Sequence, residues 1–179
     1  MDREQAIVVL KLLKTAYPRF YADITKEDAE NMVNLWIDMF KQDDPSLVIL
    51  AVKELINTLK FPPAIADVKE KMYAITTKTE SPAELWGALA KAVRNGLYGY
   101  REEFEKLPDV VKTFVREPAQ LREMAQMDSD TFHTVTKGQF LKQIEVIQKR
   151  QKDDKMMLPD VKNLMLQLTD NWNAQKYLN

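Results

Sequence analysis

Helix-start signals, each followed by apolar residues at helical spacing, constrain the fold of this chain more than any other feature. They are TKED at 25–28, DDPS at 43–46 and SPAE at 81–84. In each, a Thr, Asp or Ser side chain can accept a hydrogen bond from an unpaired N–H of the first helical turn. No segment alternates with the two-residue period of a strand. The pattern predicts an all-α fold.

A polar segment divides the helical pattern into two units. Residues 76–81, TTKTES, contain no core residue. We expect them to link an N-terminal helical domain, residues 1–75, to a C-terminal helical domain, residues 82–179. The second domain is expected to include a long helix over about residues 130–155 and an amphipathic terminal helix over about residues 160–173.

The stretch LKFPPAIADVKEKM, residues 59–72, places two adjacent prolines between two helical segments. Pro62 and Pro63 lack a backbone N–H and stop the first helix, so the next one begins at Ile65 in a changed direction. Phe61 is expected to close the first helix against the core. The corner either serves packing alone, which we favour, or also contacts a partner.

The periodicity also predicts which side chains face the core. Phe20 and Leu59 extend the apolar faces of their helices. The segment NGLYGY at 95–100 predicts a helix break, because Gly96 and Gly99 permit the backbone angles of a turn. In the long helix, the residues expected to face inward are Phe140, Leu141, Ile144 and Ile147.

Most residue types that carry enzyme chemistry are scarce. The chain has no cysteine and one histidine, His133, which excludes a Cys–His nucleophile and a site with two histidine ligands. We expect His133 to be a surface or hydrogen-bonded polar residue. The four glycines do not form a phosphate-binding loop. No enzymatic activity, cofactor or metal is therefore expected.

Charge and hydropathy limit the remaining classes. A formal net charge of −1 makes binding to nucleic acid through phosphates alone a poor explanation. No apolar run approaches the roughly 20 residues of a membrane span. The absence of cysteine fits a reducing compartment, so a soluble, cytoplasmic protein is expected.

Two segments near the C-terminus could contact other molecules. The cluster Lys149, Arg150, Lys152 and Lys155 could meet phosphates, but acidic residues lie within it and a solvated helix face is favoured. The terminal helix places Val161, Leu164, Met165, Leu168 and Trp172 along its length. This stripe either binds in a groove of a partner or packs on the protein's own helices, the interpretation slightly favoured by the pattern.

Several spaced motifs carry a family resemblance. AYPRF at 16–20, Trp36, and AVKELINTLKFPPAIADVKE at 51–70 resemble the N-terminal domain of the phage replicative helicase loader and inhibitor family. Downstream, residues 83–115 and 120–150 resemble longer phage and prophage members. The resemblance covers nearly the whole chain.

The resemblance implies a non-enzymatic phage replication protein of the bacterial host cytoplasm. Such proteins bind the hexameric replicative helicase, restrain its activity and load it onto DNA at the origin. It also implies a second partner, either an origin-binding initiator or a single-strand-binding protein. Shorter members hold the helicase with a flexible tail, whereas residues 81–179 here have the periodicity of an ordered unit. We therefore assign helicase binding to the stripe from Val161 to Trp172.

Two alternatives remain open. The protein could be a DNA-binding replication accessory or regulator, which would use the Lys149 to Lys155 cluster and the arginines at 94, 101, 116 and 122. It could also be a phage inhibitor that binds the host helicase without loading it. Sequence does not separate loading from inhibition, because both begin with binding.

Overall fold

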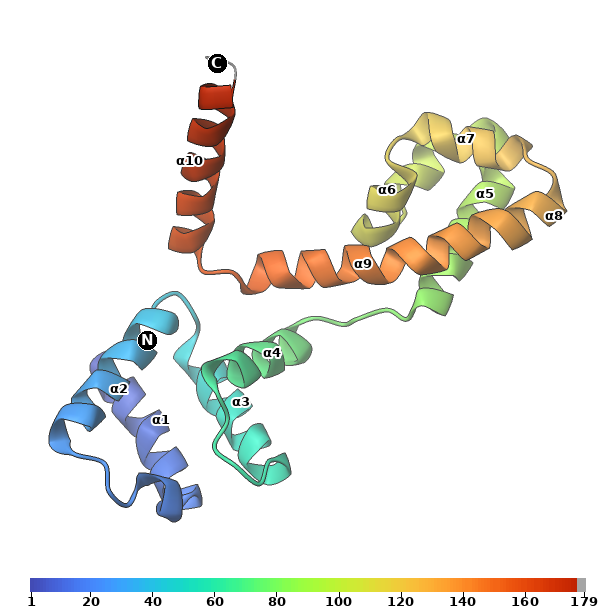
Figure 1. Ribbon diagram of the computed structural model, residues 1–179. Coiled ribbons are helices and arrows are strands. Elements are labelled where there is room, and N and C mark those ends of the chain that lie inside the picture. Colours follow the sequence, from blue (N-terminus) through green and yellow to red (C-terminus); the bar gives the residue numbers. More distant parts are fainter. Residues whose placement is uncertain (177–179) are drawn as a thin grey trace. The chain divides into compact units, whose positions relative to one another are not determined.

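The computed structural model describes residues 1–176, and the protein is all-α, as predicted (Figure 1). The helices in chain order are α1 (Arg3–Ala16), the 3-10 helix η1 (Pro18–Tyr21), α2 (Lys26–Met39), α3 (Pro45–Thr58), α4 (Ile65–Thr76), α5 (Pro82–Glu105), α6 (Asp109–Val115), α7 (Pro118–Gln126), α8 (Ser129–Thr131), the π-helical η2 (Phe132–Thr136), α9 (Lys137–Met156) and α10 (Pro159–Lys176).

The helices form two compact units. The first contains Met1–Lys78 together with residues 156–176, and the second contains Thr79–Lys155. The contacts thus group α10 with the first unit, whereas the sequence pattern placed the terminal helix in a domain over residues 82–179. Whether residues 1–75 and residues 82–179 each form an independently folding domain stays a prediction.

Local hydrogen bonds explain where three of the helices begin. The Thr25 hydroxyl accepts the N–H of Asp28 at 3.1 Å, and the Asp28 carboxylate accepts the N–H of Thr25 at 3.2 Å. Ser81 and Glu84 form the same reciprocal pair at 3.2 and 2.8 Å. The Asp44 carboxylate accepts an N–H of the first turn of α3 at 2.8 Å. All three predicted start signals are confirmed, and each such cap contributes about 1 kcal/mol.

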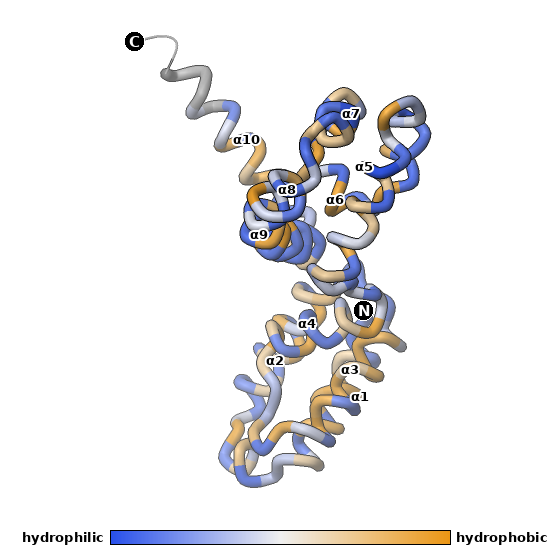
Figure 2. The backbone as a smooth tube through the Cα atoms, turned by 90° about the vertical axis from the view of Figure 1, so that its right-hand side faces the viewer, coloured by the Kyte–Doolittle hydropathy of each residue, from blue (hydrophilic) through white to orange (hydrophobic). Residues whose placement is uncertain are grey.

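The core of the first unit is formed by α1, α2, α3 and α4. Figure 2 shows long hydrophobic stretches in α1 and α3. Trp36 stacks on Phe40 with ring centroids 5.1 Å apart, and the Lys69 ammonium lies 4.7 Å from the centre of the Phe40 ring. Lys69 also forms an ion pair with Asp43. The buried core residues are Ala6, Val9, Leu13, Tyr17, Val33, Trp36, Phe40, Val48, Ala51, Val52, Val68 and Met72.

The proline corner differs from its prediction in one respect. The helices end and begin as expected, since α3 stops at Thr58 and α4 starts at Ile65. Phe61 was predicted to close the core, but it is 66% exposed, while Pro63 is buried. The two prolines turn the chain so that Pro63 takes the inward position. The prediction for Phe61 was therefore wrong.

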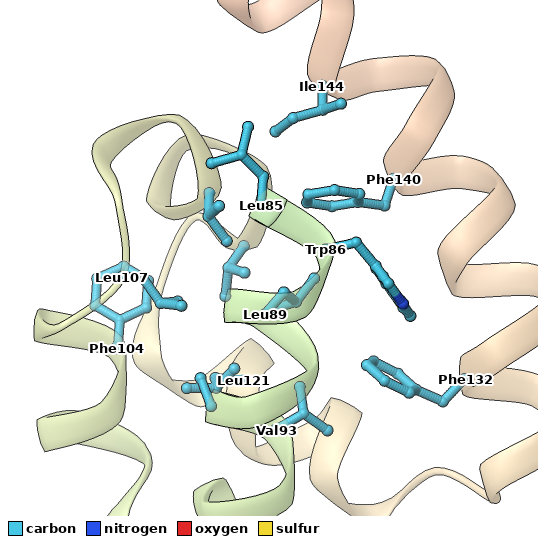
Figure 3. Close-up of a cluster of buried hydrophobic side chains, with 13 residues drawn as sticks. Leu85, Trp86, Leu89, Val93, Phe104, Leu107, Leu121, Phe132, Phe140 and Ile144 are labelled. Carbon is cyan, nitrogen blue, oxygen red and sulfur yellow. The ribbon is translucent and has the colours of Figure 1, made fainter. Parts of the chain in front are cut away.

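The second unit has its own core, shown in Figure 3. Trp86 of α5 stacks on Phe132 of η2 with centroids 4.9 Å apart, and lies 5.5 Å from Phe140 of α9. These three rings therefore bring α5, η2 and α9 together in the core of the second unit. The buried residues are Leu85, Trp86, Leu89, Ala92, Val93, Phe104, Leu107, Val111, Val115, Leu121, Phe132, Phe140 and Ile144.

Two local expectations in the second unit can be compared with the structure. The predicted break in segment 95–100 is confirmed at Gly99, whose φ of −99° and ψ of 25° are not helical, and α5 continues beyond this kink to Glu105. In α9, Phe140 and Ile144 are buried as predicted, whereas Leu141 is exposed. Residues four apart share a helix face, but Leu141 lies about 100° around the helix from Phe140.

Candidate protein-interaction site

The apolar stripe of α10 is open to solvent. Each predicted member is between 45% and 74% exposed, and every side chain from position 161 to 170 is exposed. The members recur three or four positions apart, so they share one face of the helix. They are Val161, Leu164, Met165, Leu168 and Trp172. Whether this face binds a partner or packs on the protein's own helices stays a prediction.

One further apolar residue of α10 was missed. Leu166 is 57% exposed and lies off the stripe, in the run Leu164-Met165-Leu166-Gln167-Leu168. The run itself was a signal, because a helix that packs one narrow face on a core has polar residues at the intervening positions. The exposed apolar surface of α10 is therefore wider than the predicted stripe.

One polar contact of α10 with a distant residue is located near the start of the helix. The Asp160 carboxylate pairs with the Lys41 ammonium, and hydrogen bonding to Asp160 raises the pKa of Lys41. Both groups are exposed, so solvent screens the pair. The Thr169 hydroxyl donates to the Met165 carbonyl at 2.8 Å, within the helix. These contacts leave the apolar stripe uncovered.

The predicted basic cluster lies on α9. Lys149, Arg150 and Lys155 are exposed and Lys152 is half-buried. The neighbouring Gln148 amide donates to the Glu80 carbonyl at 2.8 Å, which attaches that side of α9 to the start of the second unit. The structure thus leaves most of the cluster on the solvent side, where its role in binding stays a prediction.

Two of the four arginines of the alternative interpretation share a neighbour. The guanidinium groups of Arg101 and Arg122 lie 5.7 and 5.6 Å from the centre of the Tyr100 ring. This grouping brings α5 and α7 together at the surface. Arg94 and Arg116 are exposed as well. Sequence spacing alone did not indicate it.

His133 is exposed, as predicted, with its ring edge-on to Trp86 at 6.1 Å between centroids. Within the described part of the chain, no three His, Asp or Glu side chains are placed to hold a metal ion. A search of the same residues found no helix with the length and hydropathy of a membrane span.

The proline corner adds a second exposed apolar group, in the first unit. Phe61, Phe20 and Leu59 are 66%, 54% and 38% exposed, although the latter two were also expected to face the core. The Tyr17 hydroxyl donates to the Leu59 carbonyl at 3.2 Å and holds the end of α3 beside η1. Whether Phe61, Pro62 and Pro63 contact a partner stays a prediction.

Comparison with known proteins adds one finding for the first unit. Residues 1–69 match the family of the gp39P-like N-terminal domain, which covers α1, α2, α3 and the beginning of α4. Neither the curated proteins nor the solved structures contained a match to this chain. The resemblance of residues 83–150 to longer family members stays a prediction. Residues 1–69 are therefore similar to the N-terminal domain of the phage helicase loader and inhibitor family.

Proposed function

We propose that this protein is a non-enzymatic phage replication protein that binds the hexameric replicative helicase, restrains its activity and loads it onto DNA at the origin. It would act in the cytoplasm of the bacterial host. The observation that carries the proposal is the uncovered apolar stripe of α10 on a chain whose residues 1–69 match the gp39P-like N-terminal domain.

The stripe has the chemistry of a helix that binds in a groove. Leu164 and Leu168 are one helical turn apart, and Met165 beside them has a flexible, polarisable side chain that adapts to an irregular surface. Burying such side chains removes apolar surface from water, which stabilises a complex. Restraint of the helicase follows if α10 binds one conformation of the hexamer more tightly than the others.

Substitutions on and off the stripe of α10 test the proposal. We expect Leu164→Asp to abolish the complex with the cognate helicase in size-exclusion chromatography with light scattering, performed with and without ATP. Asn163 lies outside the stripe on the same helix, and Asn163→Asp introduces the same charge as a control. Circular dichroism and melting should be unchanged in both variants, because residue 164 is exposed.

Loss of folding together with loss of binding in Leu164→Asp would contradict the role of the stripe, as would equal effects of the two substitutions. A complex that forms and inhibits unwinding, but leaves no helicase on a single strand, would identify an inhibitor without loading activity. Loading is measured as helicase retained on single-stranded DNA after the protein is released.

Direct DNA binding is the alternative function, favoured by the grouping of Arg101 and Arg122 around Tyr100 and by the exposed side chains of Lys149 and Arg150. Each phosphate contact releases counterions, so this function requires DNA affinity that falls steeply with salt. We expect no such dependence for the protein alone. A steep dependence that Lys149→Glu with Arg150→Glu removes would favour the alternative.

A further inference from the structure

A groove of about 340 Å³ lies between α1 and α2 in the first unit. Its floor is aliphatic, and most of its side chains are only half-buried, so apolar surface remains accessible within it. The floor residues are Ile7, Leu10, Ile24, Met32 and Val33. The exposed Ala29 lies at the edge, where its small side chain leaves the groove open.

The rim of the groove is positively charged. Lys11 and Lys14 of α1 and Lys26 of α2 are exposed lining residues, and Glu30 is the only acidic residue among those that line the groove. Glu30 is occupied by Arg3, with 2.5 Å between the carboxylate oxygen and the guanidinium nitrogen. Because the charges of Glu30 and Arg3 compensate each other, the three lysines give the rim an excess of positive charge.

Two of these lysines face the groove without a counter-charge. Within residues 1–176, the Lys11 and Lys14 ammonium groups form no ion pair with an acidic side chain. They are three positions apart on α1 and therefore share a face of that helix. A ligand that supplies carboxylates beside apolar groups would satisfy both the lysines and the floor.

We propose that the α1–α2 groove binds an acidic, amphipathic helix of a partner protein. Its apolar side chains contact the aliphatic floor, and its carboxylates meet Lys11 and Lys14 on the rim. A volume near the lower end of the roughly 300–1,000 Å³ range of ligand pockets suits the insertion of a few side chains better than enclosure of a whole ligand.

The aliphatic floor of the groove favours a protein helix over a nucleic acid as its ligand. Single-stranded nucleic acids bind basic grooves whose exposed aromatic rings stack on the bases. The only aromatic lining residue here is Tyr21, which is half-buried, and burial raises the pKa of its hydroxyl. Aliphatic side chains match the apolar face of a protein helix. The site does not include α10, so it is separable from the proposed helicase contact.

Fluorescence anisotropy with the full chain tests the groove. The probe is a fluorescein-labelled 18-residue helical peptide designed with leucines three and four positions apart and glutamates on both sides of them. Two control peptides replace either all the glutamates by glutamine or all the leucines by alanine. We expect saturable binding of the probe, and roughly tenfold or greater weakening for each control peptide, because both kinds of contact contribute.

Variants of the protein locate the binding. Lys11→Glu with Lys14→Glu reverses the rim charge, and Ala29→Glu fills and repels at the groove edge. Lys53→Glu with Lys60→Glu, at two exposed lysines that do not line the groove, is the matched charge control. We expect the first two variants to weaken the probe at least about tenfold and the control to leave its affinity unchanged. Ala29 and both lysines are exposed, so melting of these variants should stay close to that of the parent chain.

Three results would overturn the proposal. The first is absence of saturable probe binding, and the second is binding that survives both groove variants. The third is salt-dependent binding of a 20-residue oligothymidylate that competes with the probe and is lost with the rim lysines but not with Ala29→Glu. That last result would identify the rim as a nucleic-acid contact.

Discussion

Phe20 and Phe61 pack edge to face, with ring centroids 5.7 Å apart and ring planes at 87°, although both side chains are more than half exposed. Phe20 belongs to η1, and Phe61 precedes the two prolines that separate α3 from α4. The rigid corner therefore presents a ring at the surface of the first unit. Its aromatic contact is made beside the core and not within it.

Replacing Phe61 by alanine should cost little stability. The substitution removes the contact with Phe20 and a partly exposed ring, so we expect the free energy of unfolding to fall by about 1 kcal/mol. Phe40 is fully buried, and Phe40→Ala should cost about 3–5 kcal/mol because it leaves a cavity. Urea unfolding of the two variants measures the difference. Equal losses would show that Phe61 supports the core after all.

The beginnings of the helices could be predicted because they depend on neighbours in the sequence. Thr25 and Ser81 each find a partner three residues later, and no distant part of the chain has to be known. The direction of Phe61 could not be predicted in the same way. It depends on which residue of the turn Phe61-Pro62-Pro63 points inward, and in the structure that residue is Pro63.

Other features required knowledge of tertiary packing. A Cβ atom at position 96 would lie 3.6 Å from Leu121 and Ala125, which is an ordinary van der Waals distance, so Gly96 lies in the packed contact between α5 and α7. The sequence does not indicate this contact, because α7 is far from Gly96 along the chain. The α1–α2 groove was also missed. Its only sequence signal was Lys11 and Lys14 following an apolar run on one helix, and α2 is needed to make a groove of it.

The start of α2 should be sensitive to acid. Hydrogen bonds from the Thr25 hydroxyl and backbone N–H lower the pKa of Asp28 below its ordinary value of 3.8. A carboxyl group whose folded pKa is lowered stabilises the fold above its unfolded pKa, and this stabilisation is lost as pH falls through the folded pKa. The difference in unfolding free energy between the parent chain and Asp28→Asn should therefore shrink below about pH 4.

Urea unfolding at several pH values between 7 and 2 measures this effect. Asp23 lies outside the helix caps, and Asp23→Asn serves as the control for the loss of one negative charge. A difference for Asp28→Asn that stays constant across the acid range would mean that the ionised carboxylate does not stabilise the cap. The same conclusion would hold if the unfolding free energy of the control Asp23→Asn changed with pH as much as that of Asp28→Asn.

Arg116 joins α6 to α7 in a strained conformation, with φ 71° and ψ −57°. The N–H of Glu117 donates to the Val115 carbonyl at 2.9 Å, which closes a three-residue turn. Positive φ costs a residue other than glycine about 1–3 kcal/mol, and glycine loses about 0.5–1 kcal/mol more than alanine to chain entropy. Arg116→Gly should therefore raise the free energy of unfolding by about 1 kcal/mol in urea. Arg122→Gly, in the exposed interior of α7, should lower it by about 1 kcal/mol. A loss at position 116 as large as that at 122 would mean that the turn stores no strain that glycine can release.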